Sequence, residues 1–210
     1  REKNIYSGHI VDLGCGSGIL AKNMADNGYT ITGVDLSQDM ITLAKRKVPN
    51  VHFVTSSFYS IDIPPCKVVT ATGECFNYIF EDSYAMSIIK DLFGRIYNSL
   101  TTRGLFIFDF AMPGRVLSSK KNNWKQNNWE MEVEHHEDEH SKALTRKIKL
   151  KVHTQNGVKE GQEIHQLQLF EKDELKSILI EVGFIPKFVN GFGSFIFPFE
   201  YGYGGFVAEK

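Results

Sequence analysis

Short apolar runs alternate with helical patterns along the first 110 residues of the chain. Each run is apolar at successive positions, which is typical of strands buried on both faces of a parallel sheet. The segments between them carry apolar residues at helical spacing. We expect strands at 10–13, 30–35, 51–55, 67–72 and 105–110, and helices at 17–27, 38–47 and 81–100. This order predicts right-handed β-α-β crossovers and a sheet covered by helices on both faces.

Residues 111–170 follow a different pattern. Residues 129–134 and 144–152 alternate between apolar and charged positions, which predicts two antiparallel strands. Glutamates follow the polar side of the first strand and lysines that of the second. Pairing Glu134 with Lys147 therefore sets opposite charges across from each other along the whole hairpin.

The sequence on either side of this hairpin indicates further elements. The polar segment 122–128 is expected to be a loop. Asn156 and Gly157 form a strong signal for a two-residue hairpin turn. This turn leads to a third strand near 160–170 and sets Ile148 opposite His165.

The end of the chain returns to the first pattern. We expect a helix at 171–182 and strands at 185–189 and 206–210, joined by the glycine- and aromatic-rich loop 190–205. The predicted fold is α/β, a Rossmann-like, doubly wound, seven-stranded sheet with its last strand antiparallel and with an inserted antiparallel β layer. We divide the chain into a core (1–110), an inserted lid or dimerisation layer (111–170) and the C-terminal part of the core sheet (171–210).

Composition narrows the partners of this domain. The chain has 24 basic and 25 acidic residues, so its formal net charge of −1 predicts no binding to nucleic acid or to an anionic membrane. No stretch approaches the roughly 18 apolar residues that span a bilayer. Residues 1–8 lack the apolar run of a secretory signal. Cys15, Cys66 and Cys75 form neither a disulfide framework nor a zinc quartet, and a reducing, cytoplasmic location is expected.

A glycine-rich turn between the first strand and the first helix carries the chemistry. Residues 11–18 read VDLGCGSG, and such glycines let a ligand approach bare backbone at the start of a helix. Asp35 ends the second strand, where a carboxylate can accept hydrogen bonds from both hydroxyls of a ribose. The dinucleotide fingerprint requires a glycine at position 19, and Ile19 there argues against a nucleotide-dependent oxidoreductase.

These motifs resemble those of the class I S-adenosylmethionine-dependent methyltransferases. The resemblance covers residues 10–110 and resumes over the last helix and strands, with DLGCGSG at 12–18 and GVDLS at 33–37 as first and second motifs. It implies S-adenosyl-L-methionine as cofactor. The cofactor residues it implies are Asp12, Gly14, Cys15, Gly16, Gly18, Asp35, Leu36, Ser57, Phe58 and Thr72.

The roles that the resemblance implies differ among these residues. The glycines surround the methionine part of the cofactor, while Asp12 orders the loop or meets the amino group through water. Asp35 binds the ribose and Leu36 lies against the adenine. Ser57 takes the place of an acidic residue that is frequent in the family, and Phe58 stacks on the adenine. Cys15 is small filler rather than a nucleophile.

The segment VTATGECFNY at 69–78 resembles the fourth motif, which contains Thr72 and borders the transferred methyl group. It is most similar to the small-molecule branch of the family. The chain lacks the sequence Asn/Asp-Pro-Pro-Tyr, which is typical of amino-methyltransferases that act on nucleic-acid bases or protein glutamine. The predicted function is methyl transfer to a nitrogen or oxygen atom of a small-molecule acceptor. Helices usually precede the first strand in the family. Only about eight residues do so here, so a longer natural chain or the later hairpins supply that cover.

Three residues are candidates for catalysis. His165 and Glu163 fall on the apolar face of the predicted hairpin, which suggests an acceptor pocket or a hydrogen-bonded structural histidine. Residues 164–170 also resemble sugar-amine N-methyltransferases. Glu74 and Asn77 follow the fourth strand, where they either orient the acceptor or serve loop hydrogen bonding. Five aromatic residues could line the acceptor pocket: Tyr78, Trp124, Trp129, Tyr201 and Tyr203.

Alternatives remain beside this interpretation. The acidic and histidine-rich segment 135–140 is more simply a solvated loop than a metal site, so no metal is expected. The inserted strands form either a lid over the acceptor or the face of a homodimer, because their apolar side must be buried. A non-catalytic module that binds the cofactor is the second function class.

Overall fold

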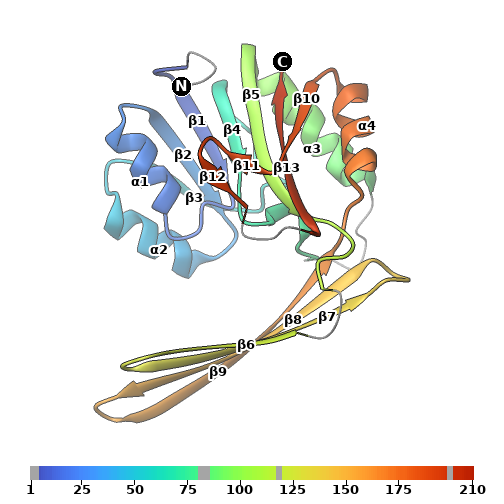
Figure 1. Cartoon of the computed structure of the whole chain (residues 1–210). Coiled ribbons are helices and arrows are strands. Elements are labelled where there is room, and N and C mark those ends of the chain that lie inside the picture. Colours follow the sequence, from blue (N-terminus) through green and yellow to red (C-terminus); the bar gives the residue numbers. More distant parts are fainter. Residues whose placement is uncertain (1–4, 80–85, 117–119, 198–200) are drawn as a thin grey trace.

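The computed structural model describes residues 5–79, 86–116, 120–197 and 201–210. Its core is a seven-stranded sheet with the strand order β10-β13-β5-β4-β1-β2-β3 (Figure 1). β13 is antiparallel to β5 and to β10, whereas β5, β4, β1, β2 and β3 are parallel neighbours. The predicted fold class is confirmed, including the antiparallel last strand.

The strands of this sheet are β1 (His9–Leu13), β2 (Thr30–Asp35), β3 (His52–Thr55), β4 (Cys66–Ala71), β5 (Leu100–Ala111), β10 (Ile185–Val189) and β13 (Tyr203–Glu209). The helices are α1 (Ile19–Asp26), α2 (Gln38–Lys47), α3 (Met86–Ser99) and α4 (Lys172–Val182), with a short 3₁₀ turn, η1 (Cys75–Asn77). The loop expected at 190–205 contains a small hairpin, β11 (Gly191–Phe192) and β12 (Phe195–Ile196). Part of the helix expected at 81–100 lies outside the described residues. No described helix has the length and apolar character needed to cross a membrane.

Alternating residues of the buried strands pack against opposite helix layers. Val11 and Leu13 of β1 belong to a large aromatic-rich cluster together with apolar residues of α3 and α4. Ile10 belongs to a smaller cluster that contains buried residues of α1 and α2. Burial of both sheet faces explains why the strands read as continuous apolar runs in the sequence.

The segment between β5 and α4 forms a separate antiparallel sheet that extends away from the core as an arm (Figure 1). Its strands are β6 (Lys120–Gln126), β7 (Trp129–Asp138), β8 (Ala143–Thr154) and β9 (Gly157–Gln168), in that order. Glu134 pairs with Lys147, and the predicted register of the central hairpin is therefore confirmed.

The expectation of a loop at 122–128 is wrong for most of that segment. Residues up to Gln126 belong to β6, which pairs with β7 along its whole length. Lys121 and Lys125 lie 2.7 and 2.5 Å from the carboxylates of Glu132 and Glu130. The low strand propensity of this polar sequence is overridden by its cross-strand partners, which the local sequence does not reveal.

The turn between β8 and β9 is shifted by one residue from the prediction. Thr154 pairs with Gly157, so the turn residues are Gln155 and Asn156. Gly157 has a positive φ of 115° and Asn156 does not, which excludes the turn type that requires a positive φ at both central residues. The shift places Arg146, rather than Ile148, opposite His165.

The face assignment survives this correction. The new register pairs Ile148 with Glu163, so it differs from the predicted one by two residues. Because side chains alternate with a period of two, Glu163 and His165 remain on the same face as Ile148.

Candidate active site

The glycine loop joins β1 to α1 at the carboxyl edge of the sheet. Gly14, Gly16 and Gly18 all have positive φ, of 71°, 52° and 75°. The amides of Gly14 and Cys15 donate to the carbonyl of Val34 at 2.8 and 3.0 Å, which fastens the loop to β2. A Cβ added to Gly16 would meet no atom within 4 Å, so this part of the backbone is open to a ligand.

Asp35 stands at the end of β2 and organises the same loop. Its Oδ2 accepts from the amide of Gly16 and its Oδ1 from the amide of Ser37, both at 2.8 Å. Each carboxylate oxygen retains a second lone pair for a hydroxyl. The next residue, Leu36, is 52% exposed. An apolar side chain beside a carboxylate at this edge fits a nucleoside, with its ribose on Asp35 and its base on Leu36.

Asp12 is a buried carboxyl group beneath the loop. It is 3% exposed, and its Oδ1 accepts from the Thr70 hydroxyl at 2.7 Å. Burial, and to a lesser degree the negative charge of Asp35, raise the pKa of Asp12 to about 7. The hydrogen bond from Thr70 acts in the opposite direction and lowers this pKa. A bound cation would offset the unfavourable burial of this charge, and the S-adenosylmethionine zwitterion carries both an ammonium and a sulfonium.

Two cysteines pack at the glycine loop. Burial raises the pKa of the Cys15 thiol to about 12 and that of Cys75 well above its usual range, so neither is a thiolate at neutral pH. A Cβ on Gly14 would come within 2.4 Å of the Cys75 sulfur. The segment that follows β4 therefore lies directly against the glycine loop.

The other expected cofactor residues differ in their access to a ligand. The Ser57 hydroxyl accepts from the amide of Tyr59 at 3.2 Å. Phe58 is 8% exposed and packs edge-on against Phe76, with ring centroids 5.6 Å apart. The structure thus places Phe58 in the hydrophobic core rather than on a ligand-facing surface. Thr72 is half-buried at the end of β4, and its carbonyl accepts from the Cys75 thiol at 3.1 Å.

Glu74 forms the centre of a buried ion-pair cluster. It has a left-handed backbone, with a φ of 61°, and its side chain is 8% exposed. Its two carboxylate oxygens receive the guanidinium groups of Arg115, from the segment after β5, and Arg146, from β8; the second lies at 2.9 Å. The cluster therefore joins the edge of the core to the inserted sheet.

Asp109 supports this cluster from β5. It is buried, and its carboxylate accepts from the amides of Gly73 and Glu74 at 2.8 and 2.7 Å. Burial raises the pKa of Asp109, and hydrogen bonds from those amides and from Tyr203 oppose the rise. The Tyr203 ring stacks on Arg115, with 4.5 Å between the ring centroid and Cζ. Asp109 thus sets the loop in which Glu74 lies.

Asn77 joins the ends of β5 and β9. It is fully buried, and its Nδ2 donates to the carbonyls of Ala111 and Gln168 at 2.9 and 2.6 Å. Its Oδ1 accepts from the Ala111 amide at 2.9 Å. These three hydrogen bonds occupy the side chain with the backbone.

His165 lies on β9, where the inserted sheet meets the core. Its Nε2 is 3.1 Å from a carboxylate oxygen of Glu163, and its ring lies edge-on to Tyr78 with 5.3 Å between centroids. Its Nδ1 is buried and has no hydrogen-bond partner among the residues that the structure describes. Arg146 is its cross-strand neighbour and donates to the Tyr78 hydroxyl at 3.3 Å. The His165 ring is therefore held in place with one nitrogen left for a ligand.

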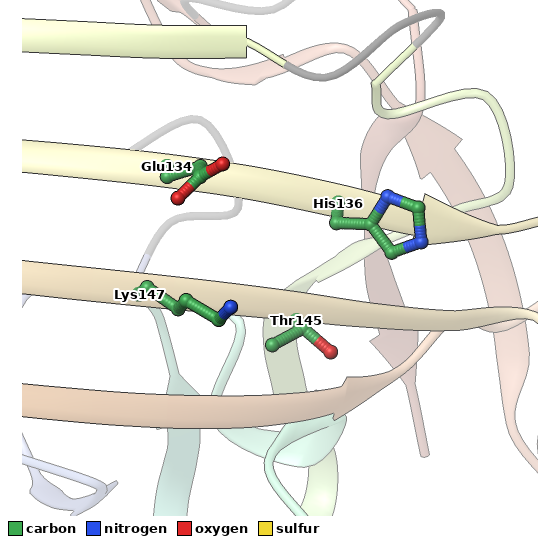
Figure 2. Close-up of a pocket in the computed structure, with 4 residues that line it drawn as sticks. All are labelled: Glu134, His136, Thr145 and Lys147. Atoms are coloured by element: carbon green, nitrogen blue, oxygen red, sulfur yellow. The ribbon is translucent and has the colours of Figure 1, made fainter.

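The opposite face of the inserted sheet carries a shallow polar pocket. Figure 2 shows its four lining residues: Glu134 and His136 on β7, and Thr145 and Lys147 on β8. They are displaced by one residue along their strands from His135 and Arg146, and so point to the other side of the sheet. In the described part of the chain, no group of three or more histidine, cysteine or acidic side chains is arranged to hold a metal ion.

Sequence analysis missed several residues of this site. It did not single out Arg115, Arg146 or Asp109, whose partners are distant in sequence. The register of the central hairpin pairs residue 135 with residue 146, and was a usable signal that Arg146 shares a face with His135. The aromatic candidates are divided: Tyr78 and Tyr203 join the cluster, Trp124 and Trp129 lie on the arm, and Tyr201 is largely exposed.

Comparison with known proteins identifies a methyltransferase domain in the core. Residues 10–103 match the family model described as a methyltransferase domain. A Geobacillus protein named as a methyltransferase is 35% identical over 106 residues, which are 48% of this chain and 41% of that protein. The chain thus spans less than half of the length of such relatives.

Solved structures of low sequence identity share the fold. An S-adenosylmethionine-dependent methyltransferase from Clostridium acetobutylicum superposes with a TM-score of 0.83 at 20% identity, covering 99% of this chain and 86% of that one. CalS10, an amino pentose methyltransferase from Micromonospora echinaspora solved with S-adenosylmethionine bound, gives 0.79 at 17% identity, covering 100% and 86%. The matched domain, the fold and the glycine loop with Asp12 and Asp35 agree: residues 10–103 match a methyltransferase domain, and the chain has the fold of S-adenosylmethionine-dependent methyltransferases.

Proposed function

We propose that the chain transfers a methyl group from S-adenosylmethionine to a nitrogen or oxygen atom of a small-molecule acceptor. The observation that carries this proposal is the buried Nδ1 of His165, whose ring packs against Tyr78. Tyr78 lies at the end of the segment after β4, and Cys75 in the same segment touches the glycine loop. The same segment pairs with β9 through Tyr78 and Leu167, so it links the cofactor loop to His165 along a short path. The description of CalS10 as an amino pentose methyltransferase supports a small acceptor with an amine.

The cofactor fits the residues at the glycine loop. In this proposal Gly14, Gly16 and Gly18 surround its methionine part, and Asp12 balances its positive charge. Asp35 and Leu36 bind the ribose and the adenine. Three further residues complete the proposed contacts, with Cys15 as filler and with Ser57 and Thr72 at the rim. The burial of Phe58 argues for an indirect role, in which it supports the adenine side from the core.

The chain's own residues align the acceptor and receive its proton. When bound, the cofactor supplies a methyl group already activated on a sulfonium, so that the protein supplies mainly alignment and a dry site. His165 Nδ1 accepts the proton of the attacking amine or hydroxyl. Glu163, hydrogen-bonded to Nε2, stabilises the imidazolium that forms.

Glu74 and Asn77 take positioning roles in this proposal. Both carboxylate oxygens of Glu74 are occupied by arginines, so Glu74 is poorly placed to contact the acceptor itself. We assign it to fixing Arg146, and through Arg146 the hydroxyl of Tyr78. Asn77 fixes the ends of β5 and β9, and hence the distance between the cofactor edge and His165.

The proposal extends to partners and location. A net charge of −1 favours a small-molecule acceptor over nucleic acid or an anionic membrane surface. We also infer a cytoplasmic location, because the cysteines are free and two of the three are buried. The division into a cofactor-binding core (1–110), an inserted layer (111–170) and a C-terminal part of the core sheet (171–210) is part of the same proposal.

Titration calorimetry with S-adenosylmethionine and S-adenosylhomocysteine tests the cofactor site. We expect the wild type to bind with a Kd of about micromolar order, and we expect Asp35→Ala to abolish this binding. Asp39→Ala, an exposed carboxylate in the first turn of α2, is the matched control and should bind like the wild type. Equal binding by all three proteins would contradict the assignment of Asp35.

Formation of S-adenosylhomocysteine on a panel of small amines and alcohols tests the reaction. His165→Gln should lower kcat by about 10²-fold or more while leaving the Kd for S-adenosylmethionine unchanged. The control is His153→Gln. His153 is exposed and lies on β8, on the face of the inserted sheet opposite to that of His165. Cofactor binding without turnover on any acceptor would favour the non-catalytic module instead.

A further inference from the structure

The two faces of the inserted sheet differ sharply in character. One face carries the charged ladder in which Glu132 lies 2.7 Å from Lys121 and 3.5 Å from Lys149. The other face is apolar over the outer half of the arm. Its side chains are Trp124 on β6, Trp129, Met131 and Val133 on β7, and Ile148, Leu150 and Val152 on β8. A sheet with one charged and one apolar face normally covers the apolar one.

The core leaves this surface only partly covered: Val133 is buried, but Trp124 and Leu150 are not. The buried cluster where the sheet meets the core contains Leu144 and Leu167, at the inner end of the arm. Farther out, Trp124 is 44% and Leu150 is 38% exposed. Figure 1 shows the arm extending away from the helices of the core. The described chain therefore leaves the outer half of this face partly uncovered.

Registers arrange the apolar side chains in three rows across the strands. The middle row is Trp124, Met131, Leu150 and Gly161. One neighbouring row is Gln126, Trp129, Val152 and Lys159, and the other is Asn122, Val133, Ile148 and Glu163. The middle row has no charged member, and Gly161 leaves its β9 end flat.

The polar ends of the outer rows are complementary to each other. Lys159 and Glu163 lie on the same face of β9, two residues to either side of Gly161. A two-fold axis that runs along the middle row places a second copy face to face with the first. The row that contains Lys159 then lies over the row that contains Glu163 of the second copy. Lys159 then meets Glu163 of the partner subunit. A surface that is complementary to itself in this way has the property that an isologous dimer requires.

We propose that the apolar face of the inserted sheet is a homodimer interface, in which the arms of two copies pack face to face about the row that contains Leu150. Stacked sheets pack about 10 Å apart with their side chains interdigitated. This proposal and the methyl-transfer proposal share Glu163, which also contacts His165, but they are tested separately because the test of this one measures mass rather than methyl transfer.

The size of the surface indicates a weak dimer rather than an obligate one. Four strands about 4.8 Å apart and three rows about 7 Å apart cover roughly 400 Å² in projection. This is small among specific interfaces, so we expect dimerisation to depend on concentration over about 1–100 µM. The strands of both partners are already paired, which limits the backbone ordering that binding requires.

Sedimentation velocity over that concentration range is the first test. The wild type should shift from monomer to dimer, and Leu150→Glu should remain monomeric throughout. Lys149→Glu, on the charged face one residue away, should dimerise like the wild type. Circular dichroism and thermal melting of both variants check that they fold.

A charge exchange makes the test specific to the proposed axis. Lys159→Glu alone and Glu163→Lys alone should each weaken dimerisation about tenfold, because like charges then face each other at two symmetric places. The double variant should recover the wild-type association. A monomer at every concentration would overturn the proposal. A dimer that Leu150→Glu does not disrupt would also overturn it. So would a monomer in which Leu150→Glu raises only the KM of the acceptor, because the apolar face would then bind the substrate.

Discussion

Replacing Asp12 by asparagine tests whether the buried carboxylate under the glycine loop destabilises the folded chain in favour of binding a cation. Asparagine keeps the shape of the side chain and an oxygen that accepts from Thr70. It removes the charge and replaces the second oxygen by an NH2 group. The free energy of unfolding and the affinity for S-adenosylmethionine should therefore change in opposite directions.

The pKa of Asp12 sets the size and the pH range of the effect. Burial raises this pKa from an ordinary value of 3.8 to about 7. Between these values the unfolded chain is ionised while the folded chain holds the proton, so the folded state loses relative stability as the pH rises from about 4 to about 7. A pKa difference of about three corresponds to roughly 4 kcal/mol at pH 8 and to less than about 2 kcal/mol at pH 5.

Urea unfolding at pH 5, 6, 7 and 8 measures this difference. Asp12→Asn should be more stable than the wild type at pH 8, by up to about 4 kcal/mol, and the advantage should shrink by about 2–3 kcal/mol at pH 5. Asp91→Asn, an exposed carboxylate on α3, should show no such change between pH 5 and 8. A constant difference between Asp12→Asn and the wild type at all four pH values would refute the reasoning.

Cofactor binding supplies the second half of the same experiment. Above pH 7 Asp12 is ionised and attracts the positive charges of S-adenosylmethionine, so the Kd of the wild type should rise by up to about tenfold for each pH unit below 7. Asp12→Asn should bind weakly with little dependence on pH. Calorimetric titration at the same four pH values gives both curves, and a Kd of the wild type that is independent of pH contradicts the role of Asp12.

Two further substitutions test the packing between the glycine loop and the ion-pair cluster. In Gly14→Ala the new Cβ meets the Cys75 sulfur at a position of positive φ, so the variant should lose about 2–3 kcal/mol of unfolding free energy and bind the cofactor more weakly. The control is Gly28→Ala, which also has a positive φ but lies in open space. In urea unfolding it should lose only about 1 kcal/mol, and its calorimetric binding of the cofactor should stay intact. Arg115→Ala leaves the buried Glu74 with one arginine and should lower the free energy of unfolding by about 3 kcal/mol or more. The double variant Arg115→Ala with Glu74→Gln should recover part of this lost free energy. No recovery would mean that packing rather than charge holds the pair.

The parts of the fold that local sequence determines were predicted well. Buried strands, the glycine loop and the acid after β2 each leave a signal within a few residues, and Asp35 lies where that signal placed it. β6 was missed because its polar residues become a strand only through pairing with β7. The turn at Gly157 was misplaced by one residue because a single positive φ, rather than two, sets its geometry.

The candidate site was less predictable because its partners are far apart in sequence. The bonds between Asp109 and the amides of Gly73 and Glu74 cross more than thirty residues, and the pair of Glu74 with Arg146 crosses more than seventy. No periodicity in the sequence records such contacts. The residue types alone suggested Glu74 as an acceptor-facing group, and only the structure showed the arginines that neutralise it.

One short segment connects all the parts of the proposed chemistry. Cys75 touches the glycine loop, Glu74 binds both arginines, and Tyr78 pairs with the inserted sheet at Leu167. A shift of this segment would change the cofactor loop and the position of His165 together. The left-handed backbone of Glu74 is unfavourable for a residue with a side chain, and it is retained because the Asp109 carboxylate holds its amide. The strain is thus located where the core meets the arm, which is where the proposed reaction requires the methyl donor and its acceptor to be aligned.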